Sequence, residues 1–361
     1  MPNNGMDDVV AAETVLSDVD GSAGRLILRG YSLDDLAGVA RYEDMLSILL
    51  AGFFPDLPDE KRLPAALGAT RRDVAALIRT DDAALPPIEA VRAMMARIPD
   101  GEDCETALKL IAAPAVFTAA VLRLRRGLAP LAPDESATHA ADILRMIEGA
   151  TPGPERVAAL DAYLVTVSDH GLNASTFAAR VVASTRAGLT SAVLAAISAL
   201  KGPLHGGAPG PVLDALDSIG APDRAEEWLE SAVAQGERLM GFGHRVYRVR
   251  DPRADALKAA LARLARSGGV DLSRVALAEA VERAALTLLK RKKPDRPLDT
   301  NVEFYTALLL EALNMPRDAF TCVFAMGRVG GWIAHAREQV LNGRLIRPKS
   351  RYIGPIPKEA A

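Results

Sequence analysis

Residues 202–208 read Gly-Pro-Leu-His-Gly-Gly-Ala, so His205 stands among glycines in a segment that also contains proline. Two further histidines have glycine neighbours, in Asp-His-Gly at 169–171 and in Gly-Phe-Gly-His at 241–244. Glycine lets a backbone approach a ligand closely, and reactive groups gather on loops at helix ends. One such histidine alone is more often a satisfied imidazole, but three together predict a functional site. The remaining two, which have helix-like surroundings and which we interpret as structural, are His139 and His335.

Four arginines and one glutamate are further candidate site residues. Arg248 and Arg253 follow the third histidine closely, whereas Arg328 lies among glycines and Arg347 precedes a proline. Each alone is usually a solvated charge, but converging guanidinium groups bind carboxylates and phosphates in a bidentate way. Glu303 has apolar and aromatic neighbours, so it is either a base with raised proton affinity or an ordinary acid near a helix start. These residue types predict a small ligand with several carboxylates.

The remainder of the chain has mostly helical patterns. Only residues 24–30, Gly-Arg-Leu-Ile-Leu-Arg-Gly, predict strands, in a short N-terminal β-hairpin. Thr70 is expected to cap one helix, Pro87 to open a second and Ser273 to cap a third.

Proline and glycine mark two irregular segments. Residues 201–211 predict a loop around His205, and residues 345–358 predict an extended C-terminal arm that could reach a neighbouring subunit.

The composition limits the classes of function. A chain of 361 residues favours two domains, and its net charge of -3 offers no basic stripe for nucleic acid. Cys104 and Cys322 lack any ligand or disulfide spacing, so no metal site is predicted. The polar N-terminus resembles no targeting peptide and predicts a cytoplasmic location. The apolar residues 177–200 are interrupted by arginines, so they predict a buried helix and no membrane span.

Together these segments resemble the citrate synthase family, from Asp20-Gly21 to the C-terminal arm. Residues 169–176 look like the family's oxaloacetate-binding histidine segment, residues 202–208 like its first catalytic loop and residues 241–253 like its second. Several motifs in the family's order make a chance agreement improbable.

The resemblance implies an all-α homodimer with two domains and a short N-terminal β-hairpin. The large domain is expected to hold both ends of the chain, residues 1–206 and 315–361. The small domain is expected to comprise residues 207–314, inserted after the first catalytic loop.

The resemblance also implies a role for each candidate residue. Glu303 would take a proton from the acyl methyl group, neutral His205 would hydrogen-bond the thioester oxygen of the enol, and His244 would donate to the keto oxygen of oxaloacetate. The residues implied to bind oxaloacetate are His170, Asn173, Arg253 and Arg328, with Arg347 supplied by the other subunit. The residues implied to bind coenzyme A are Arg248 and the backbone of Met240, Gly241, Phe242 and Gly243. Acetyl-coenzyme A is then a substrate, and no metal or other cofactor is implied.

Three positions depart from the family pattern. Glu303 stands where the family usually has aspartate, Pro209-Gly210 replaces Asn-Glu, and Gly171 replaces an acidic residue. Besides citrate synthase, a 2-methylcitrate synthase that uses propionyl-coenzyme A fits every motif. A binding paralogue with weak turnover is a hypothesis of another class, and Glu303, Pro209 and Gly210 favour it. A lyase is less favoured, because nothing resembles the additional domain that couples such cleavage to ATP.

Overall fold

The structure is a computed structural model of the chain, and it describes residues 9–206, 209–296 and 298–355. Within these residues the α-helices are α1 (Leu33–Leu36), α2 (Tyr42–Leu50), α3 (Leu63–Ala75), α4 (Pro87–Met95), α5 (Cys104–Arg125), α6 (His139–Glu148), α7 (Pro154–Thr166), α8 (Ala174–Ala183), α9 (Leu189–Leu200), α10 (Pro209–Ile219), α11 (Ala225–Ala234), α12 (Pro252–Arg266), α13 (Leu272–Lys292), α14 (Val302–Ala312) and α15 (Phe320–Asn342). The all-α prediction is confirmed. The described part of the chain also has three short 3-10 helices, at Asp81–Ala84, Pro222–Arg224 and Arg317–Ala319.

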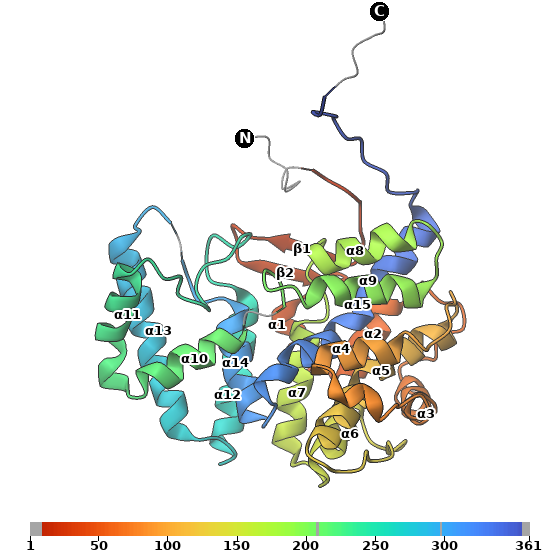
Figure 1. Cartoon of the computed structure of the whole chain (residues 1–361), viewed down its shortest axis with the longest axis horizontal. Coiled ribbons are helices and arrows are strands. Elements are labelled where there is room, and N and C mark those ends of the chain that lie inside the picture. The colour runs from red at the N-terminus through yellow and green to blue at the C-terminus, as the bar shows by residue number, and fades with distance from the viewer. Residues whose placement is uncertain (1–8, 207–208, 297, 356–361) are drawn as a thin grey trace, which may run out of the picture.

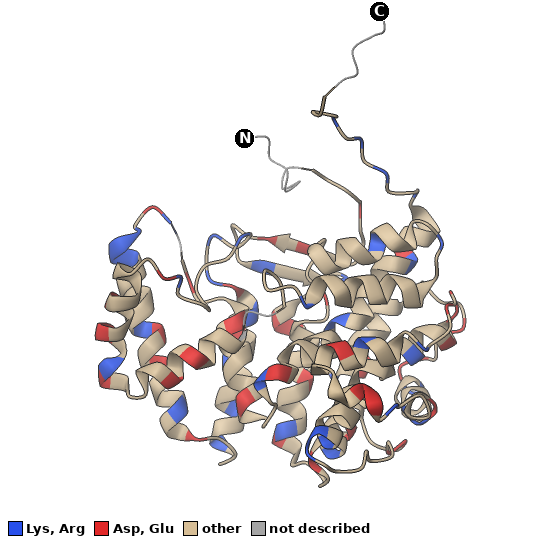
Figure 2. Cartoon of the chain, in the orientation of Figure 1, with Lys and Arg blue, Asp and Glu red and all other residues tan. Residues whose placement is uncertain are grey.

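Two groups of helices are visible in Figure 1. Helices α10–α14 lie on one side, and the helices that precede residue 200 lie on the other with α15 among them. The domain boundaries at residues 206/207 and 314/315 stay a prediction. Basic and acidic residues are interspersed along both groups in the view of Figure 2.

The N-terminal sheet has three antiparallel strands in the order β1 (Ser17–Asp20), β2 (Arg25–Leu28) and β3 (Tyr31–Ser32). Leu26 and Leu28 are buried while Arg25 is exposed, which is the alternation of a strand that buries one face. The predicted hairpin is confirmed, and the short strand β3 extends it.

Helix α15 packs at the centre of the core, where Trp332 is fully buried. Its glycines allow close contacts: a Cβ atom at Gly327 would lie 2.5 Å from Val167 Cγ2, and one at Gly331 would lie 2.2 Å from the carbonyl oxygen of Ser168. These glycines therefore bring Arg328 against the segment that leads to His170.

One helix of the described residues, α5, is long and apolar enough to cross a membrane. The most apolar window of this helix is 83% buried inside the protein, and buried core helices commonly have this composition. The apolar residues 177–200, expected to form one buried helix, instead form α8 and α9. The chain turns between them at Gly188, which has a φ angle of 101°.

Two predicted helix starts were wrong. Helix α3 begins at Leu63, so Thr70 lies inside it and donates to the carbonyl of Ala66 at 2.8 Å. The cap of α13 is Asp271, whose carboxylate accepts the backbone N–H of Ser273 at 2.9 Å. Both serine and aspartate cap helices well, so the sequence alone did not separate neighbouring candidates.

Two other expectations concern a helix start and a loop. The start of α4 at Pro87 is confirmed. The loop expected over residues 201–211 is shorter, because α10 begins at Pro209.

Candidate active site

Two segments that are far apart in the sequence pair beside the candidate histidines. The N–H of Gly243 donates to the carbonyl of Asp299 at 2.7 Å, and the N–H of Asn301 donates to the carbonyl of Gly241 at 2.9 Å. Gly241 and Gly243 have φ angles of 86° and 79°, which glycine adopts at little cost. This pairing joins the segment that leads to His244 with the start of the helix that carries Glu303.

His244 is held in one tautomer by the backbone. Its Nδ1 atom accepts the N–H groups of Val246 and Tyr247 at 3.0 and 3.1 Å, so in the neutral ring the proton is on Nε2. That Nε2 atom lies 3.2 Å from a terminal nitrogen of Arg253, which is also a donor. Two donors this close favour a ligand oxygen, from a carboxylate or a carbonyl, that lies beside the pair and accepts from both.

Arg253 is oriented by a carboxylate. Its Nε and one terminal nitrogen donate to the two oxygens of Asp251 at 3.0 and 2.8 Å, and its side chain is buried. The guanidinium also lies 5.7 Å from the ring centre of Tyr247. The terminal nitrogen that donates to Asp251 is the same one that lies 3.2 Å from His244, so this edge of Arg253 links the carboxylate to the histidine.

His170 lies next to these groups. Its Nε2 atom is 3.2 Å from the hydroxyl of Tyr247, and its ring centre is 5.8 Å from that of His244. Burial, followed by the nearby charges of Arg253 and Arg328, lowers the pKa of His170 well below its ordinary value. The ring is therefore neutral at pH 7.

His205 is bound by helix α8. Its Nε2 atom lies 2.8 Å from the hydroxyl of Ser175, which also accepts the indole N–H of Trp332 at 3.1 Å. The Ser175 hydroxyl lies 2.8 Å from Asn173 Oδ1 as well. Since the serine has one proton, it donates either to Asn173 or to His205, and this choice fixes the tautomer of His205.

Burial keeps the rings of His205 and His244 neutral in the physiological range.

Arg328 is a buried cation with unused donors. Its side chain is 1% exposed, and its Nε donates to the carbonyl of Val167. Among the residues that the structure describes, none accepts a hydrogen bond from its two terminal nitrogens. Burial and, less strongly, the charge of Arg253 lower the pKa of Arg328 to about 10. An arginine in this state is a binding group for a carboxylate.

Glu303 is the carboxylate of the site. It lies in the first turn of α14, where its N–H donates to the side-chain oxygen of Asn301 at 3.0 Å. Within the described ranges, no residue donates a hydrogen bond to its carboxylate. Burial raises the pKa of Glu303, against the opposing charges of Arg253 and Arg238. An unpaired, largely desolvated carboxylate is a suitable general base.

The structure brings six predicted residues together, and we name them the site cluster: His170, His205, His244, Arg253, Arg328 and Glu303. The arginines of the cluster act on its histidines. Burial and then Arg328 lower the pKa of His205 to about 4, and burial and then Arg253 lower the pKa of His244 to about 4.

Other predicted residues lie differently. Asn173 caps α8 and accepts the N–H of Thr176 at 3.1 Å. Arg248 has an exposed side chain, and its backbone N–H donates to Gly21 at 2.7 Å. Arg347 is exposed on the C-terminal segment that extends away from the helical body in Figure 1. The substrate contacts predicted for these residues stay predictions.

The backbone expected to bind coenzyme A is only partly available. The N–H of Gly243 and the carbonyl of Gly241 are used by the pairing with residues 299–301. Met240 and Phe242 line a cavity of about 260 Å³ together with Phe304 and residues of α10 and α11. The predicted contact therefore depends on the backbone groups that the pairing leaves unused.

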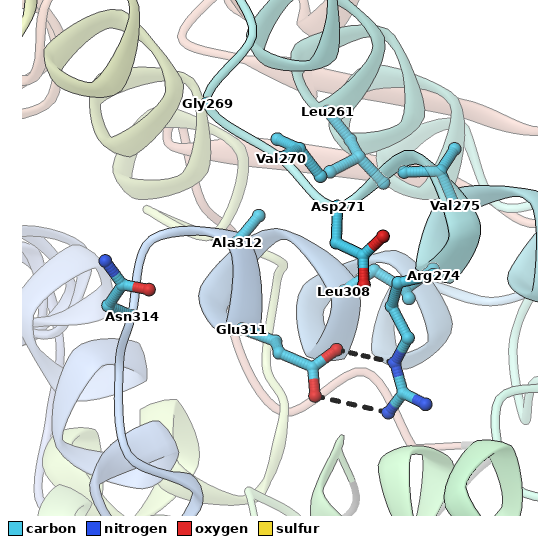
Figure 3. A pocket seen from close by; sticks show the side chains of 10 residues that line it. All are labelled: Leu261, Gly269, Val270, Asp271, Arg274, Val275, Leu308, Glu311, Ala312 and Asn314. Carbon is cyan, nitrogen blue, oxygen red and sulfur yellow. Dashed lines mark hydrogen bonds and ion pairs between the residues drawn. The ribbon is translucent and has the colours of Figure 1, made fainter.

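Figure 3 shows a larger cavity of about 330 Å³ that lies elsewhere, between the ends of α12, α13 and α14. The charged groups in it satisfy one another: Arg274 pairs with Glu311 at 2.8 Å, and Asp271 caps α13. Among the described residues, no group of three or more His, Cys, Asp and Glu side chains is arranged to hold a metal ion.

The comparison with protein families agrees with this geometry. The profile described as "Citrate synthase, C-terminal domain" matches residues 5–349. The chain belongs to the citrate synthase family. It is similar to a citrate synthase of Haloferax volcanii, with 38% identity over 97% of this chain and 95% of the relative. It is also similar to a 2-methylcitrate synthase of Mycobacterium tuberculosis, with 34% identity over 97% of this chain and 90% of the relative.

A solved structure gives the same result. The citrate synthase of Thermoplasma acidophilum, in a ternary complex with carboxymethyl coenzyme A and oxaloacetate, matches with a TM-score of 0.84 and 29% identity, covering 99% of this chain and 97% of that one. The chain is accordingly an acyltransferase of the citrate synthase type, an enzyme class that performs a condensation.

Sequence reasoning about the citrate synthase site missed three residues that the fold adds to it. Ser175 contacts His205 directly, and Trp332 donates to the Ser175 hydroxyl. Tyr247 lies against His170 and His244. Ser175 and Tyr247 were within the quoted motifs, so their hydroxyl groups could have been noted. Trp332 gave no signal, because its indole reaches the site only through the packing of α15.

Proposed function

We propose that this enzyme condenses acetyl-coenzyme A with oxaloacetate and water to give citrate and coenzyme A. The observation that carries the proposal is the site cluster, in which an unpaired carboxylate and neutral imidazoles share one site with two buried arginines. The complex of the Thermoplasma acidophilum relative with oxaloacetate and a coenzyme A derivative supports the same substrate classes.

Proton removal is the first step of the proposed reaction. Glu303 takes a proton from the methyl carbon of the thioester. Burial raises the pKa of Glu303, so its carboxylate binds that proton more readily than an exposed one would. His205 stabilises the enol by donating an N–H to the thioester oxygen, where charge develops. This requires the donating proton on Nδ1, so the Ser175 hydroxyl must donate to Nε2 of His205 during the reaction.

Carbon–carbon bond formation follows. The proton on Nε2 of His244 is directed to the keto oxygen of oxaloacetate, which makes the carbonyl carbon more electrophilic. The buried guanidinium groups of Arg253 and Arg328 bind the two carboxylates, as pairs of such groups commonly do. The enol carbon attacks the keto carbon, and hydrolysis of the citryl thioester makes the condensation hard to reverse.

The assembly of the proposed enzyme is a homodimer. Arg347 is exposed on an extended segment, which supports its delivery to the site of a second subunit. Residues 207–314 are proposed as a small domain that closes over the substrates, with the loop around His205 near the hinge. The proposed location is cytoplasmic.

Propionyl-coenzyme A is the second candidate substrate, because the 2-methylcitrate synthase of Mycobacterium tuberculosis is similar over nearly the whole chain. One additional methylene discriminates only modestly in an apolar pocket, so both thioesters are expected to react to some extent. A binding paralogue with weak turnover is the alternative that Glu303, Pro209 and Gly210 favour.

The test is the release of coenzyme A thiol by the purified protein. With oxaloacetate present, we expect release from acetyl-coenzyme A, and the ratio of kcat/KM for the two thioesters names the synthase. The variant Glu303→Gln, which keeps size but removes the base, is expected to lower the rate by about a thousandfold. Oxaloacetate binding without any thiol release from either thioester would instead favour the binding paralogue.

A further inference from the structure

Asp251 is a buried carboxylate that binds two parts of the site cluster at once. Its side chain is 1% exposed. Oδ1 accepts the backbone N–H and the Nε of Arg253, both at 3.0 Å, while Oδ2 accepts a terminal nitrogen of Arg253 at 2.8 Å. Oδ2 also accepts the backbone N–H of Val302 at 3.1 Å. Val302 is the first residue of α14 and directly precedes Glu303.

The contact with Val302 distinguishes Asp251 from an ordinary helix cap. Asp271 provides the comparison, because it also caps a helix by accepting the N–H two residues on, at 2.9 Å, and also accepts a nearby side chain. The partners of Asp271 belong to its own helix start, and its side chain is exposed. Asp251 instead spans 51 residues of sequence to reach the helix of the base.

A second link runs parallel to this one. The side chain of Asn301 donates to the carbonyl of Gly243 at 2.8 Å and accepts the N–H of Glu303 at 3.0 Å. Asn301 thus connects the base to the segment before His244, as Asp251 connects it to Arg253. With both links in place, the helix start cannot shift without moving groups that face the other substrate.

We propose that Asp251 is a positioning residue that couples the carboxylate-binding Arg253 to the base Glu303, so that oxaloacetate binding and proton removal depend on one side chain. This inference rests on the proposed function, since it assigns these two residues to two substrates. If Asp251 only capped its helix, its replacement would lower only the stability. If it only paired with Arg253, its replacement would weaken only oxaloacetate binding.

The first experiment compares Asp251→Asn with Asp271→Asn. Asparagine keeps one oxygen for the helix cap, but its NH₂ group replaces the other oxygen. Since both oxygens of Asp251 accept hydrogen bonds, the NH₂ group would face N–H donors. We expect Asp251→Asn to weaken oxaloacetate binding, measured by calorimetry, and to lower kcat at saturating oxaloacetate, each by at least about tenfold. Asp271→Asn should leave both within about twofold of wild type, as expected for an exposed site away from the cluster. Loss of affinity with unchanged kcat, or no change in either, would overturn the proposal.

The pH dependence of kcat/KM gives a readout that a structural role would not move. The charged groups that affect Glu303 are Arg253 and Arg238, which lower its pKa, and Asp251, which raises it. Removing the charge of Asp251 should therefore move the acid limb of the profile to lower pH. An acid limb that stays in place would contradict the electrostatic part of the coupling.

Val302→Pro decides the matter if Asp251→Asn does not fold. Proline suits the first position of a helix, and Asn301 already has the extended backbone that precedes proline, with φ -105° and ψ 175°. The variant removes the N–H that Asp251 accepts and leaves the Arg253 pair in place. We expect kcat to fall by about tenfold while oxaloacetate affinity stays within about threefold. Unchanged kcat would overturn the proposal.

The wild-type assay separates the two levels of inference. If the wild-type protein releases no thiol from either thioester, the proposed function fails. If it turns over and the variants behave like Asp271→Asn, the function stands and the role of Asp251 is wrong.

Discussion

Arg71 and Arg328 are both almost fully buried, yet their surroundings differ. Arg71 donates through Nε to Asp142 at 2.8 Å and through one terminal nitrogen to the carbonyls of Asp134 and Ala137 at 2.9 and 2.8 Å, while its other terminal nitrogen meets His139 at 3.4 Å. Among the described residues Arg328 has one such partner, the carbonyl of Val167. We name Arg71, His139 and Asp142 the core cluster.

The difference separates a structural charge from a binding charge. A buried cation is costly unless its donors are satisfied, and in the core cluster the protein supplies the partners itself. In the site cluster the terminal donors of Arg328 are left for a ligand. Burial is therefore common to both clusters, and the number of unused donors marks the functional one.

The largest expected effect breaks the core cluster. Arg71→Met removes every bond of that guanidinium and should lower the free energy of unfolding by about 3 kcal/mol, since one partner of a buried pair is left behind. Arg145, which also binds Asp142 at 2.7 Å, keeps the effect from being larger. Urea unfolding measures it. Arg72→Met is the matched control. The Arg72 side chain is 61% exposed, so its loss should change the free energy of unfolding by less than about 0.5 kcal/mol. Equal effects of the two variants would refute this account of the core cluster.

The next effect separates the clusters. Arg328→Met should weaken oxaloacetate binding by about a hundredfold, because a buried carboxylate partner is lost, while stability changes little. Calorimetry and urea unfolding of the same sample report the two quantities. Arg337 lies on the same helix and pairs with Glu102, so Arg337→Met should leave the affinity for oxaloacetate unchanged. A loss of stability as large as that of Arg71→Met would mean that Arg328 is structural.

A smaller effect concerns the neutral histidines. Burial lowers the pKa values of His205 and His244 to about 4, from 6.5 in the unfolded chain. The unfolded state therefore binds more protons as the pH falls, so their contribution to stability is complete above about pH 6.5, declines toward pH 4 and is constant below it. The double variant His205→Gln/His244→Gln should show a shallower decline in denaturant titrations from pH 6.5 to 4.5. An unchanged slope would show that these rings are protonated when folded.

The smallest effect sharpens the position of the base. Glu303→Asp withdraws the carboxylate by roughly one methylene from a backbone that Asn301 and Asp251 hold in place. We expect the rate to fall by about tenfold, measured as thiol release. A rise in the rate would mean that the native glutamate is poorly placed for the chemistry.

Much of the candidate site could be predicted from the sequence, because its histidines and arginines lie in short segments with unusual glycine content. The loop before His244 needs two glycines with positive φ angles, and that requirement is visible as Gly-Phe-Gly. Helix boundaries were harder: Thr70 looks like a cap but lies inside α3, where its hydroxyl donates to the carbonyl of Ala66. At the start of α13, Asp271 and Ser273 are both suitable caps, and Asp271 accepts the N–H group.

By itself, the sequence determined the helical class and the short N-terminal strands and indicated the candidate site residues, because these depend on local periodicity and on residues with special backbone freedom. Only the tertiary structure decided which charges are satisfied. Arg71 and Arg328 are the same residue type, and Asp251 and Asp271 both follow the pattern of a helix cap. Their different roles arise from partners that are dozens of residues away, since hydrogen bonds depend on distances in space that local sequence patterns do not specify.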